Sequence, residues 1–241
     1  CIYRLPRDSS IVFPPSSCPK CNNRIKAWDN VPIISYIFLK GRCRYCGEKI
    51  SIRYPFVELL NGILYWLVFS YFGYGWHLPF LFAFCSSMIV ITFIDLDFQI
   101  IPDVITLPGI IIGFLGASFF IPDVFNVHIL DSNLSITGFR NSLIGFLLGG
   151  GLFYLIAVLS RGGMGGGDIK MMAMVGAFLG WKAVLLTTFI GSLTGSFVGI
   201  FLIVFKGKGR KTKIPFGPFL ALGSIFALFF GGDLLNWYLQ L

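Results

Sequence analysis

The sequence predicts an all-α polytopic membrane protein that carries a small N-terminal metal-binding module. Three observations lead to this class: a very apolar composition, uncharged stretches as long as membrane-spanning helices, and four paired cysteines near the start of the chain. Of the 241 residues, 56% are hydrophobic and 12% are charged, and the mean hydropathy is +0.81. Soluble globular domains carry about 25% charged residues, so this composition excludes an ordinary soluble protein.

Uncharged stretches divide the chain after residue 55 into about seven membrane segments. A spanning α-helix needs roughly 20 apolar residues. The stretch Leu59–Ile94 contains no Lys, Arg, Asp or Glu, so it is long enough for two spans joined by a turn around Gly73–His77. The stretch Met172–Trp181 is shorter, and we expect a short or tilted helix there. In chain order, the expected segments cover residues 56–72, 79–94, 104–121, 140–159, 171–180, 183–205 and 214–231.

The positive charges predict the orientation of these segments. Residues 1–55 hold ten Lys and Arg against three acids, and the loop Lys206–Lys213 holds five more basic residues. Because basic loops stay in the cytoplasm, we expect a cytoplasmic module over residues 1–55 and a membrane domain over residues 56–241. The net charge of +8 then reflects topology, and no nucleic-acid partner is expected. The chain starts at Cys1 without a methionine, which favours a trimmed start over a protein that begins with this module.

Two C-x-x-C motifs in the basic N-terminal region predict a metal site. Cys18 and Cys21 form the first motif, and Cys43 and Cys46 form the second after a spacer of 21 residues. Four thiolates at this spacing can wrap one tetrahedral zinc ion. Disulfides are the alternative, but a cytoplasmic region is reducing, which favours zinc. A four-cysteine site has no open position for water, so we expect a structural zinc that stabilises a module with little core of its own.

Two acids stand at the ends of apolar segments, where a charged side chain is unfavourable and usually functional. Asp95 ends the run SSMIVITFI, and Asp168 closes the tract RGGMGGGDIK. Counting the segments places both acids on the cytoplasmic side. If the two carboxyl groups meet, repulsion and desolvation separate their proton affinities, so that one can act as a base and the other as an acid on a peptide bond. The two histidines, His77 and His128, fall in predicted external loops, which disfavours catalysis by a Ser/His or Cys/His pair.

The glycines before Asp168 are expected to give this site room. Gly165, Gly166 and Gly167 have no side chains, so a substrate backbone or a neighbouring helix can come close; a flexible loop between helices is the alternative. A Lys-Ser/Thr sequence does not follow, so a phosphate-binding loop is poorly supported. Lys170 either holds this region near lipid headgroups, orients a substrate carboxylate, or is simply a basic residue at a cytoplasmic helix end.

Several motifs together resemble one known family. The segments FPPSSCPKC, WDNVPIISYIFLKGRCRYC, FIDLDFQIIPD, GMGGGDIKMMAMVGAFLGW and KIPFGPFLALG are similar, in order and over nearly the whole chain, to the type IV prepilin peptidases. These enzymes are membrane aspartyl proteases of the GxGD class. The family's first transmembrane helix has no counterpart here, so the resemblance implies eight spans where seven are counted.

The resemblance implies a specific activity. Such enzymes sit in the bacterial inner membrane and remove the basic leader of prepilins and pseudopilins after a glycine, on the cytoplasmic face. Most members with a tetra-cysteine module then methylate the new N-terminus with S-adenosylmethionine. The family's two catalytic aspartates match Asp95 and Asp168. Glu58 lies just inside the first span, where an acid is costly unless it is paired or functional. In the family such a glutamate supports methyl transfer or binds the substrate terminus, and an ion pair with a residue such as Arg53 is an equal alternative.

Two other functions fit parts of the pattern. A transporter or channel could use the intramembrane acids to relay protons or bind cations. A zinc-stabilised scaffold could assemble a secretion machine without catalysis. The acids distinguish these readings, because only the peptidase requires both Asp95 and Asp168 for cleavage of a leader peptide.

Overall fold

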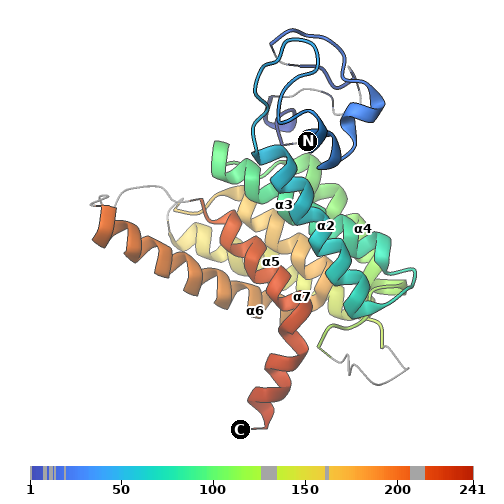
Figure 1. Ribbon diagram of the computed structural model, residues 1–241. Coiled ribbons are helices and arrows are strands. Elements are labelled where there is room, and N and C mark those ends of the chain that lie inside the picture. The colour runs from blue at the N-terminus through green and yellow to red at the C-terminus, as the bar shows by residue number, and fades with distance from the viewer. Residues whose placement is uncertain are drawn as a thin grey trace.

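The computed structural model describes residues 2–7, 10, 13, 15–18, 20–125, 135–160, 163–206 and 215–240. Figure 1 shows a helical bundle that carries a loop-rich N-terminal module at one end. Two short 3₁₀ helices, Leu5–Arg7 and Ala27–Asn30, lie in this module. The α-helices among the described residues are α1 (Ile34–Phe38), α2 (Arg53–Phe72), α3 (Leu78–Phe98), α4 (Asp103–Phe119), α5 (Gly138–Leu159), α6 (Gly166–Lys206) and α7 (Gly217–Leu239).

The helices of the bundle confirm the predicted fold class. Five of them, α2, α3, α5, α6 and α7, are long and apolar enough to cross a membrane, and α4 is a shorter apolar helix. No strand forms in the described parts of the chain, where pairing is limited to three isolated bridges. The turn expected around Gly73–His77 separates α2 from α3, and Gly73 ends α2 with a positive φ of 69°. Glycine adopts this backbone conformation without strain.

The predicted segments 171–180 and 183–205 are the two arms of α6. Gly180 interrupts this 41-residue helix with non-helical angles of φ 81° and ψ −178°. Before the break, α6 runs against α5, where Gly149 meets Met172. After the break it runs against α7, where a Cβ on Gly195 would lie 3.2 Å from the Phe216 ring. The chain therefore reverses direction at Gly180 without a loop. The first arm starts earlier than predicted, at Gly166.

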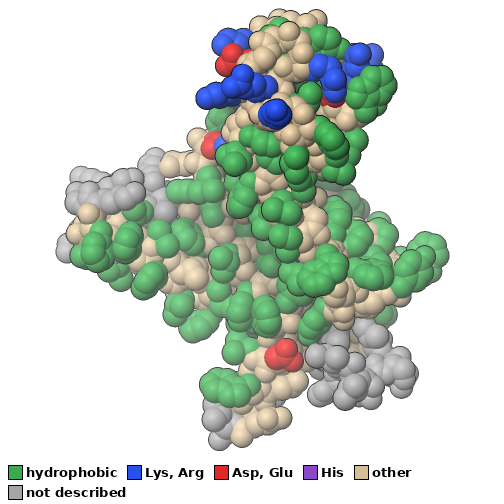
Figure 2. Space-filling model, in the orientation of Figure 1, with side chains coloured by type: hydrophobic (Ala, Val, Ile, Leu, Met, Phe, Trp, Pro, Cys, Tyr) green, Lys and Arg blue, Asp and Glu red, His purple; other side chains and the backbone are tan. Residues whose placement is uncertain are grey.

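The core of the bundle is formed mainly by α3 and the first arm of α6. Along that arm, every residue from Met171 to Gly180 is buried, and Phe178 packs against Phe84 of α3 with ring centroids 5.0 Å apart. The outside of the bundle is also apolar, since Trp66, Phe119 and Phe197 are 66–73% exposed. Figure 2 shows such hydrophobic side chains over much of the visible face of the bundle, as lipid exposure requires.

Charged side chains gather at the end of the bundle that carries the module. In Figure 2, Lys and Arg side chains cluster on the module, beyond the apolar surface of the helices. Asp95, near the end of α3, and Asp168, at the start of α6, line one cavity, and Figure 1 places these helix ends on the side of the bundle that faces the module. Most of the predicted basic loop, residues 207–213, and His128 lie outside the described residues.

Candidate active site and metal centre

Asp95 is held by contacts at both its backbone and its side chain. It lies in the last turn of α3 and is only 5% exposed. Its carbonyl oxygen accepts the backbone N–H of Gln99 at 2.9 Å, which ends the helix. Its Oδ2 accepts the backbone N–H of Gly217, at the start of α7, also at 2.9 Å. This second bond joins residues 122 positions apart and fixes the orientation of the carboxylate.

Asp168 lies in the first turn of α6 and is 9% exposed. Its backbone N–H donates to the carbonyl oxygen of Gly165 at 3.2 Å, so the glycine tract folds back as the helix begins. The N-terminus of a helix carries partial positive charge, which favours an acid in this turn. The start of α6 therefore fixes the position of the carboxylate.

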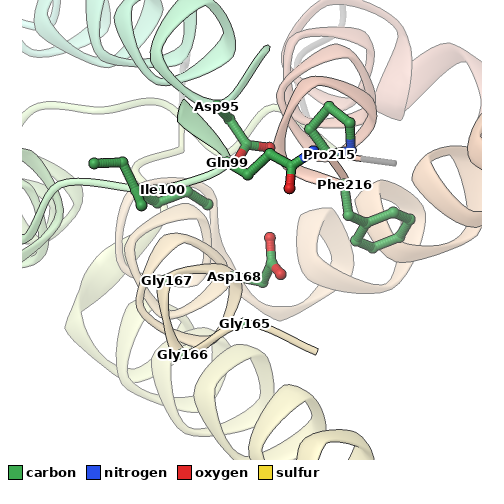
Figure 3. Close-up of a pocket in the computed structure, with 10 residues that line it drawn as sticks. Asp95, Gln99, Ile100, Gly165, Gly166, Gly167, Asp168, Pro215 and Phe216 are labelled. Carbon is green, nitrogen blue, oxygen red and sulfur yellow. The ribbon is translucent and has the colours of Figure 1, made fainter. Parts of the chain in front are cut away.

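Both carboxylates line a single cavity of about 320 Å³. Figure 3 shows Asp95 and Asp168 pointing into the same space from opposite walls. The sequence predicted that these acids would meet, and the geometry brings them together. The other described lining residues are Gln99, Ile100, Ile101, Gly165, Gly166, Gly167, Pro215 and Phe216. Two carboxyl groups that face one cavity can supply the acid and the base for hydrolysis of a peptide bond.

The three glycines of the tract have different surroundings. A Cβ on Gly167 would lie 2.7 Å from the Cβ of Ile101, so this glycine lets α6 approach the segment between α3 and α4. A Cβ on Gly166 would meet no protein atom within 4 Å, and one on Gly165 would lie 3.4 Å from Oδ2 of Asp168. The sequence offered two uses for the missing side chains, close approach of a neighbouring segment and room for a substrate backbone. Gly167 permits the close approach, and Gly166 leaves open space at the cavity.

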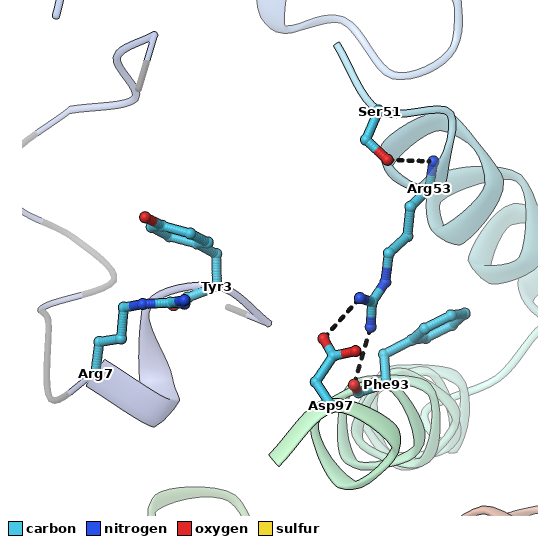
Figure 4. A network of polar contacts seen from close by, with 6 residues as sticks. All are labelled: Tyr3, Arg7, Ser51, Arg53, Phe93 and Asp97. Carbon is cyan, nitrogen blue, oxygen red and sulfur yellow. Dashed lines mark hydrogen bonds and ion pairs between the residues drawn. The ribbon is translucent and has the colours of Figure 1, made fainter. Parts of the chain in front are cut away.

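Two ion pairs hold the helix ends that carry the acids. Arg53 Nη1 donates to Oδ2 of Asp97 at 2.6 Å, and Nη2 donates to the carbonyl oxygen of Phe93 at 2.9 Å. Figure 4 shows this guanidinium reaching from the start of α2 to the end of α3. Lys170 Nζ lies 2.6 Å from Oδ2 of Asp103, the first residue of α4. Asp97 is thus directed away from the cavity, as its position two residues after the cavity acid predicts.

Glu58 binds the module and does not pair with Arg53. Its Oε2 accepts the backbone N–H of Ile33 at 2.8 Å. Ile33 precedes α1 and has a φ of 61°, a conformation that is unfavourable for a β-branched residue. Arg53, the alternative partner that the sequence offered, contacts Asp97 instead. Glu58 therefore connects α2 to the module through a strained turn.

The four cysteines form one cluster that could hold a metal ion. Their sulfur atoms all lie within 4.8 Å of one another, and Cys18 Sγ is 3.8 Å from Cys46 Sγ. Tetrahedral ligands about 2.3 Å from zinc lie about 3.8 Å apart, so the cluster has the right size. In each motif, the carbonyl oxygen of the first cysteine accepts a hydrogen bond from the backbone N–H four residues later. Asn22 donates to Cys18, and Gly47 donates to Cys43. The two turns are therefore alike, although they differ in sequence.

The environment of these thiols favours a bound cation. Backbone N–H groups of Cys21 and Lys20 lower the pKa of Cys18 to about 6. The backbone N–H of Glu48 acts in the same direction at Cys46, but burial and the other three thiols raise the pKa of Cys46 to about 12. A cluster of this kind ionises fully when a cation neutralises the thiolates. The donor set therefore fits a metal of the zinc class.

Sequence reasoning missed Gly217, which orients Asp95, and Gln99, which lines the cavity. Gly217 donates to Asp95 from a helix that begins 122 positions later, and a single sequence gives no sign of such a contact. Gln99 follows α3 in a left-handed conformation that glycine or asparagine usually fills. The QIIPD segment could have indicated the end of the helix, but not the direction of the glutamine side chain. Pro215 and Phe216, which directly precede α7, also line the cavity.

Comparisons with known proteins agree over almost the whole chain. The profile of the bacterial peptidase A24 N-terminal domain matches residues 1–72, and that of the type IV leader peptidase family matches residues 82–200. No solved structure shows significant similarity.

Three relatives illustrate the similarity, each called prepilin leader peptidase/N-methyltransferase. The protein from Legionella pneumophila is 38% identical over 232 residues, which are 95% of this chain and 77% of that protein. The one from Aeromonas hydrophila is 36% identical over 95% of this chain and 76% of its own length. The one from Pseudomonas aeruginosa is 34% identical over 96% and 77%. With these matches and the two acids over one cavity, the chain belongs to the type IV leader peptidase family.

Proposed function

We propose that this protein is a membrane aspartic endopeptidase that removes the basic leader of type IV prepilins or pseudopilins, cutting after a glycine. The observation that carries the proposal is the shared cavity of Asp95 and Asp168. The names of the relatives, which include leader peptidase and N-methyltransferase, support prepilin cleavage followed by N-methylation. The family match supports the peptidase over a transporter or a scaffold.

The two carboxyl groups can carry out the hydrolysis between them. One, ionised, accepts a proton from a water molecule as the water oxygen attacks the peptide carbonyl carbon. The other, protonated, donates a hydrogen bond to the carbonyl oxygen, where negative charge develops. When the C–N bond breaks, a proton passes from a carboxyl group to the leaving amine. Gly217 supports this chemistry because its N–H fixes the Asp95 carboxylate in the cavity.

The open space over Gly166 suits the cleavage site that we propose. A substrate glycine has no side chain, so its backbone can lie close to the wall of the cavity. Gly165 and Gly166 line this wall beside Asp168, and neither brings a side chain into it. We therefore assign Gly165, Gly166 and Gly167 to the substrate-facing loop. Lys170, which pairs with Asp103, acts by holding α6 against α4.

We assign a structural zinc ion to Cys18, Cys21, Cys43 and Cys46. With four thiolates the ion would have no open position, so it would supply folding energy to the module and no catalytic step. S-adenosylmethionine is the proposed methyl donor, because the relatives are called N-methyltransferases. We assign no residue to its binding. Glu58 would act in this part of the protein by fixing the module to α2.

The proposed setting is the bacterial inner membrane, with the module over residues 1–55 and the cavity at its cytoplasmic face. Ten basic residues in the module support this sidedness. Residues 56–241 would form the membrane domain, embedded in lipid and open to prepilins from the cytoplasmic side. A prepilin leader is basic and stays in the cytoplasm by the same rule, so the cut site and the cavity would lie on one side.

The test is cleavage of a full-length prepilin by the purified protein in lipid vesicles, followed by mass spectrometry of the product. We expect a mature protein that starts directly after the leader glycine, and transfer of a labelled methyl group when S-adenosylmethionine is added. Asp233→Asn is the control and should cleave at the unmodified rate, because Asp233 is an exposed acid of α7 that does not line the cavity. Ion flux through the vesicles without cleavage would favour the transporter and refute the peptidase. Cleavage without label would leave a peptidase only.

A further inference from the structure

Gln99 occupies a backbone position that its residue type does not favour. It follows α3 with φ 56° and ψ 39°, in the left-handed region. Glycine fills this position at helix ends most often and asparagine next. Four non-glycine residues in the described chain have positive φ, namely Asn22, Ile33, Lys40 and Gln99. Of these four, Gln99 alone lines the cavity of the two acids. Strained residues of this kind cluster at functional sites.

The backbone of Gln99 fixes where its side chain begins. Its N–H donates to the carbonyl oxygen of Asp95 at 2.9 Å, so the two residues are locked one helical turn apart. Figure 3 shows the Gln99 side chain extending across the space between the carboxylates of Asp95 and Asp168. The residue is exposed, so its carboxamide lies at the mouth of the cavity, where an incoming peptide would pass.

The cavity is rich in acceptors and poor in side-chain donors. Its described lining consists of two acids, three glycines, two isoleucines, one proline, one phenylalanine and Gln99. Among these side chains, only the Gln99 carboxamide carries N–H groups; a carboxylate accepts hydrogen bonds and donates none unless it is protonated. A peptide bond under attack needs donors at its carbonyl oxygen, where the negative charge develops. Gln99 can supply one.

We propose that Gln99 is a substrate-binding residue of the cleavage site, whose carboxamide N–H donates a hydrogen bond to the carbonyl oxygen of the peptide bond that is cut. This role rests on the proposed peptidase function. It assigns a task to each polar group of the cavity: the two carboxyl groups handle the protons, and Gln99 stabilises the oxygen. It also explains the residue type, because glycine has no donor and asparagine is one methylene shorter.

The experiment compares Gln99→Gly and Gln99→Asn with the unmodified protein in vesicles. Gln99→Gly removes the amide but suits the left-handed backbone, so the midpoint of thermal unfolding should stay equal or rise. A donor that acts in the transition state contributes to kcat, and losing one typically costs roughly 10²-fold. We therefore expect Gln99→Gly to lower kcat by about that factor with little change in KM. Gln99→Asn should recover part of the rate. Lys40→Gly, which changes a residue of φ 52° in the module, is the matched control and should cleave at the unmodified rate.

The outcomes separate this inference from the proposed function. Cleavage by Gln99→Gly within about twofold of the unmodified protein would overturn the role of Gln99 and leave the peptidase intact. A higher KM at unchanged kcat would also overturn it, since that result means ground-state binding only. If Gln99→Gly folds poorly, Gln99→Asn takes its place as the test. A folded Gln99→Asn variant that cleaves no faster than Gln99→Gly would then overturn the role of Gln99 as well. Absence of cleavage by the unmodified protein would instead count against the proposed function.

Discussion

Gly217 determines the geometry of the cavity at the scale of one residue. A Cβ on this glycine would lie 2.7 Å from Oδ2 and 3.2 Å from Cγ of Asp95. Any side chain would therefore push the carboxylate away or tilt the start of α7. The same glycine supplies the N–H that orients Asp95. Because Gly217 has no side chain, the Asp95 carboxylate can come close enough to accept this hydrogen bond.

We predict that Gly217→Ala lowers leader cleavage by at least about tenfold, because displacement of a catalytic group by an ångström can cost about 10²-fold. The rate in vesicles measures this effect. Gly62→Ala is the control, since a Cβ at Gly62 of α2 meets nothing within 4 Å. Unchanged cleavage by Gly217→Ala would mean that the contact with Asp95 does not position the acid.

The two acids of the cavity were easier to predict from the sequence than the residues that hold them in place. Asp95 and Asp168 were identified because ionised groups at the edge of apolar segments are rare and costly. Gly217 and Gln99 were not, because their roles depend on which helix ends meet in space. Glu58 was noticed for the same reason as the acids, but its role stayed open, and Arg53 was only one of the partners considered. The backbone N–H that it binds, at Ile33, leaves no mark on the sequence.

The packing of α5 against the first arm of α6 is the closest contact between two elements. A Cβ on Gly145 would lie 2.5 Å from the carbonyl oxygen of Gly176, and a Cβ on Gly176 would overlap the backbone of Gly145. Gly149 meets the backbone of Met172 in the same way. Small residues let helix backbones approach closely in membranes, where packing drives helix association. This contact keeps the arm that begins with Asp168 in the centre of the bundle.

Gly176→Ala should destabilise the protein by about 1–3 kcal/mol, as overpacking of a rigid contact does. Backbone atoms on the opposite helix cannot move aside as a flexible side chain would. Unfolding in detergent, followed by circular dichroism, measures the loss. Gly151→Ala, on an open face of α5, should unfold at the same temperature as the unmodified protein. Equal stability of the two variants would contradict the close packing.

At this scale the sequence predicted the elements better than their contacts. Glycines are typical of helices that pack closely in membranes, and on α5 Gly145 and Gly149 face α6, whereas a Cβ on Gly151 would meet no atom within 4 Å. The sequence alone could not show which face of α5 makes this contact, because the helix that packs against α5 was not known. The short segment 171–180 was expected because its uncharged run is brief. The sequence did not predict that this segment continues directly into the next one at Gly180, because a glycine is equally compatible with a loop.

The whole molecule joins a module with almost no core to a well-packed bundle. Among the described residues before α2, only Cys18, Ser35 and Gly41 are buried. Residues 20–52 contain turns, a short 3₁₀ helix and one α-helix of only five residues. Such a segment buries too little apolar surface to fold alone. A metal ion held by the four cysteines would supply the missing stability, together with contacts such as Glu58 with Ile33.

We predict that removing the metal unfolds the module and spares the bundle. Treatment with a strong chelator, or Cys43→Ser, should raise hydrogen exchange over residues 20–50 while the exchange of α3 and of the first arm of α6 stays the same. Exchange measured by mass spectrometry in detergent tests this, with metal analysis of the reduced protein alongside. Cys85→Ser is the control, since Cys85 is buried in α3, away from the cluster. A reduced protein without metal, or unchanged exchange in the module, would refute the site.

Counting the segments along the sequence placed Asp95 and Asp168 on the same side of the membrane, and both acids line one cavity. The cavity itself could not be predicted, because it depends on three helix ends, those of α3, α6 and α7, closing over one space. The central claim is that two carboxyl groups from distant segments work as one unit there. Groups that act as a unit lose activity together, and the second loss adds little to the first.

Cleavage rates of Asp95→Asn, Asp168→Asn and the double variant test this claim most directly. Both single variants should fold and insert as the unmodified protein does, and each should lose cleavage by at least about 10³-fold. The double variant should be no slower than the slower single one. Substantial cleavage by either single variant, or losses that multiply in the double variant, would contradict the account.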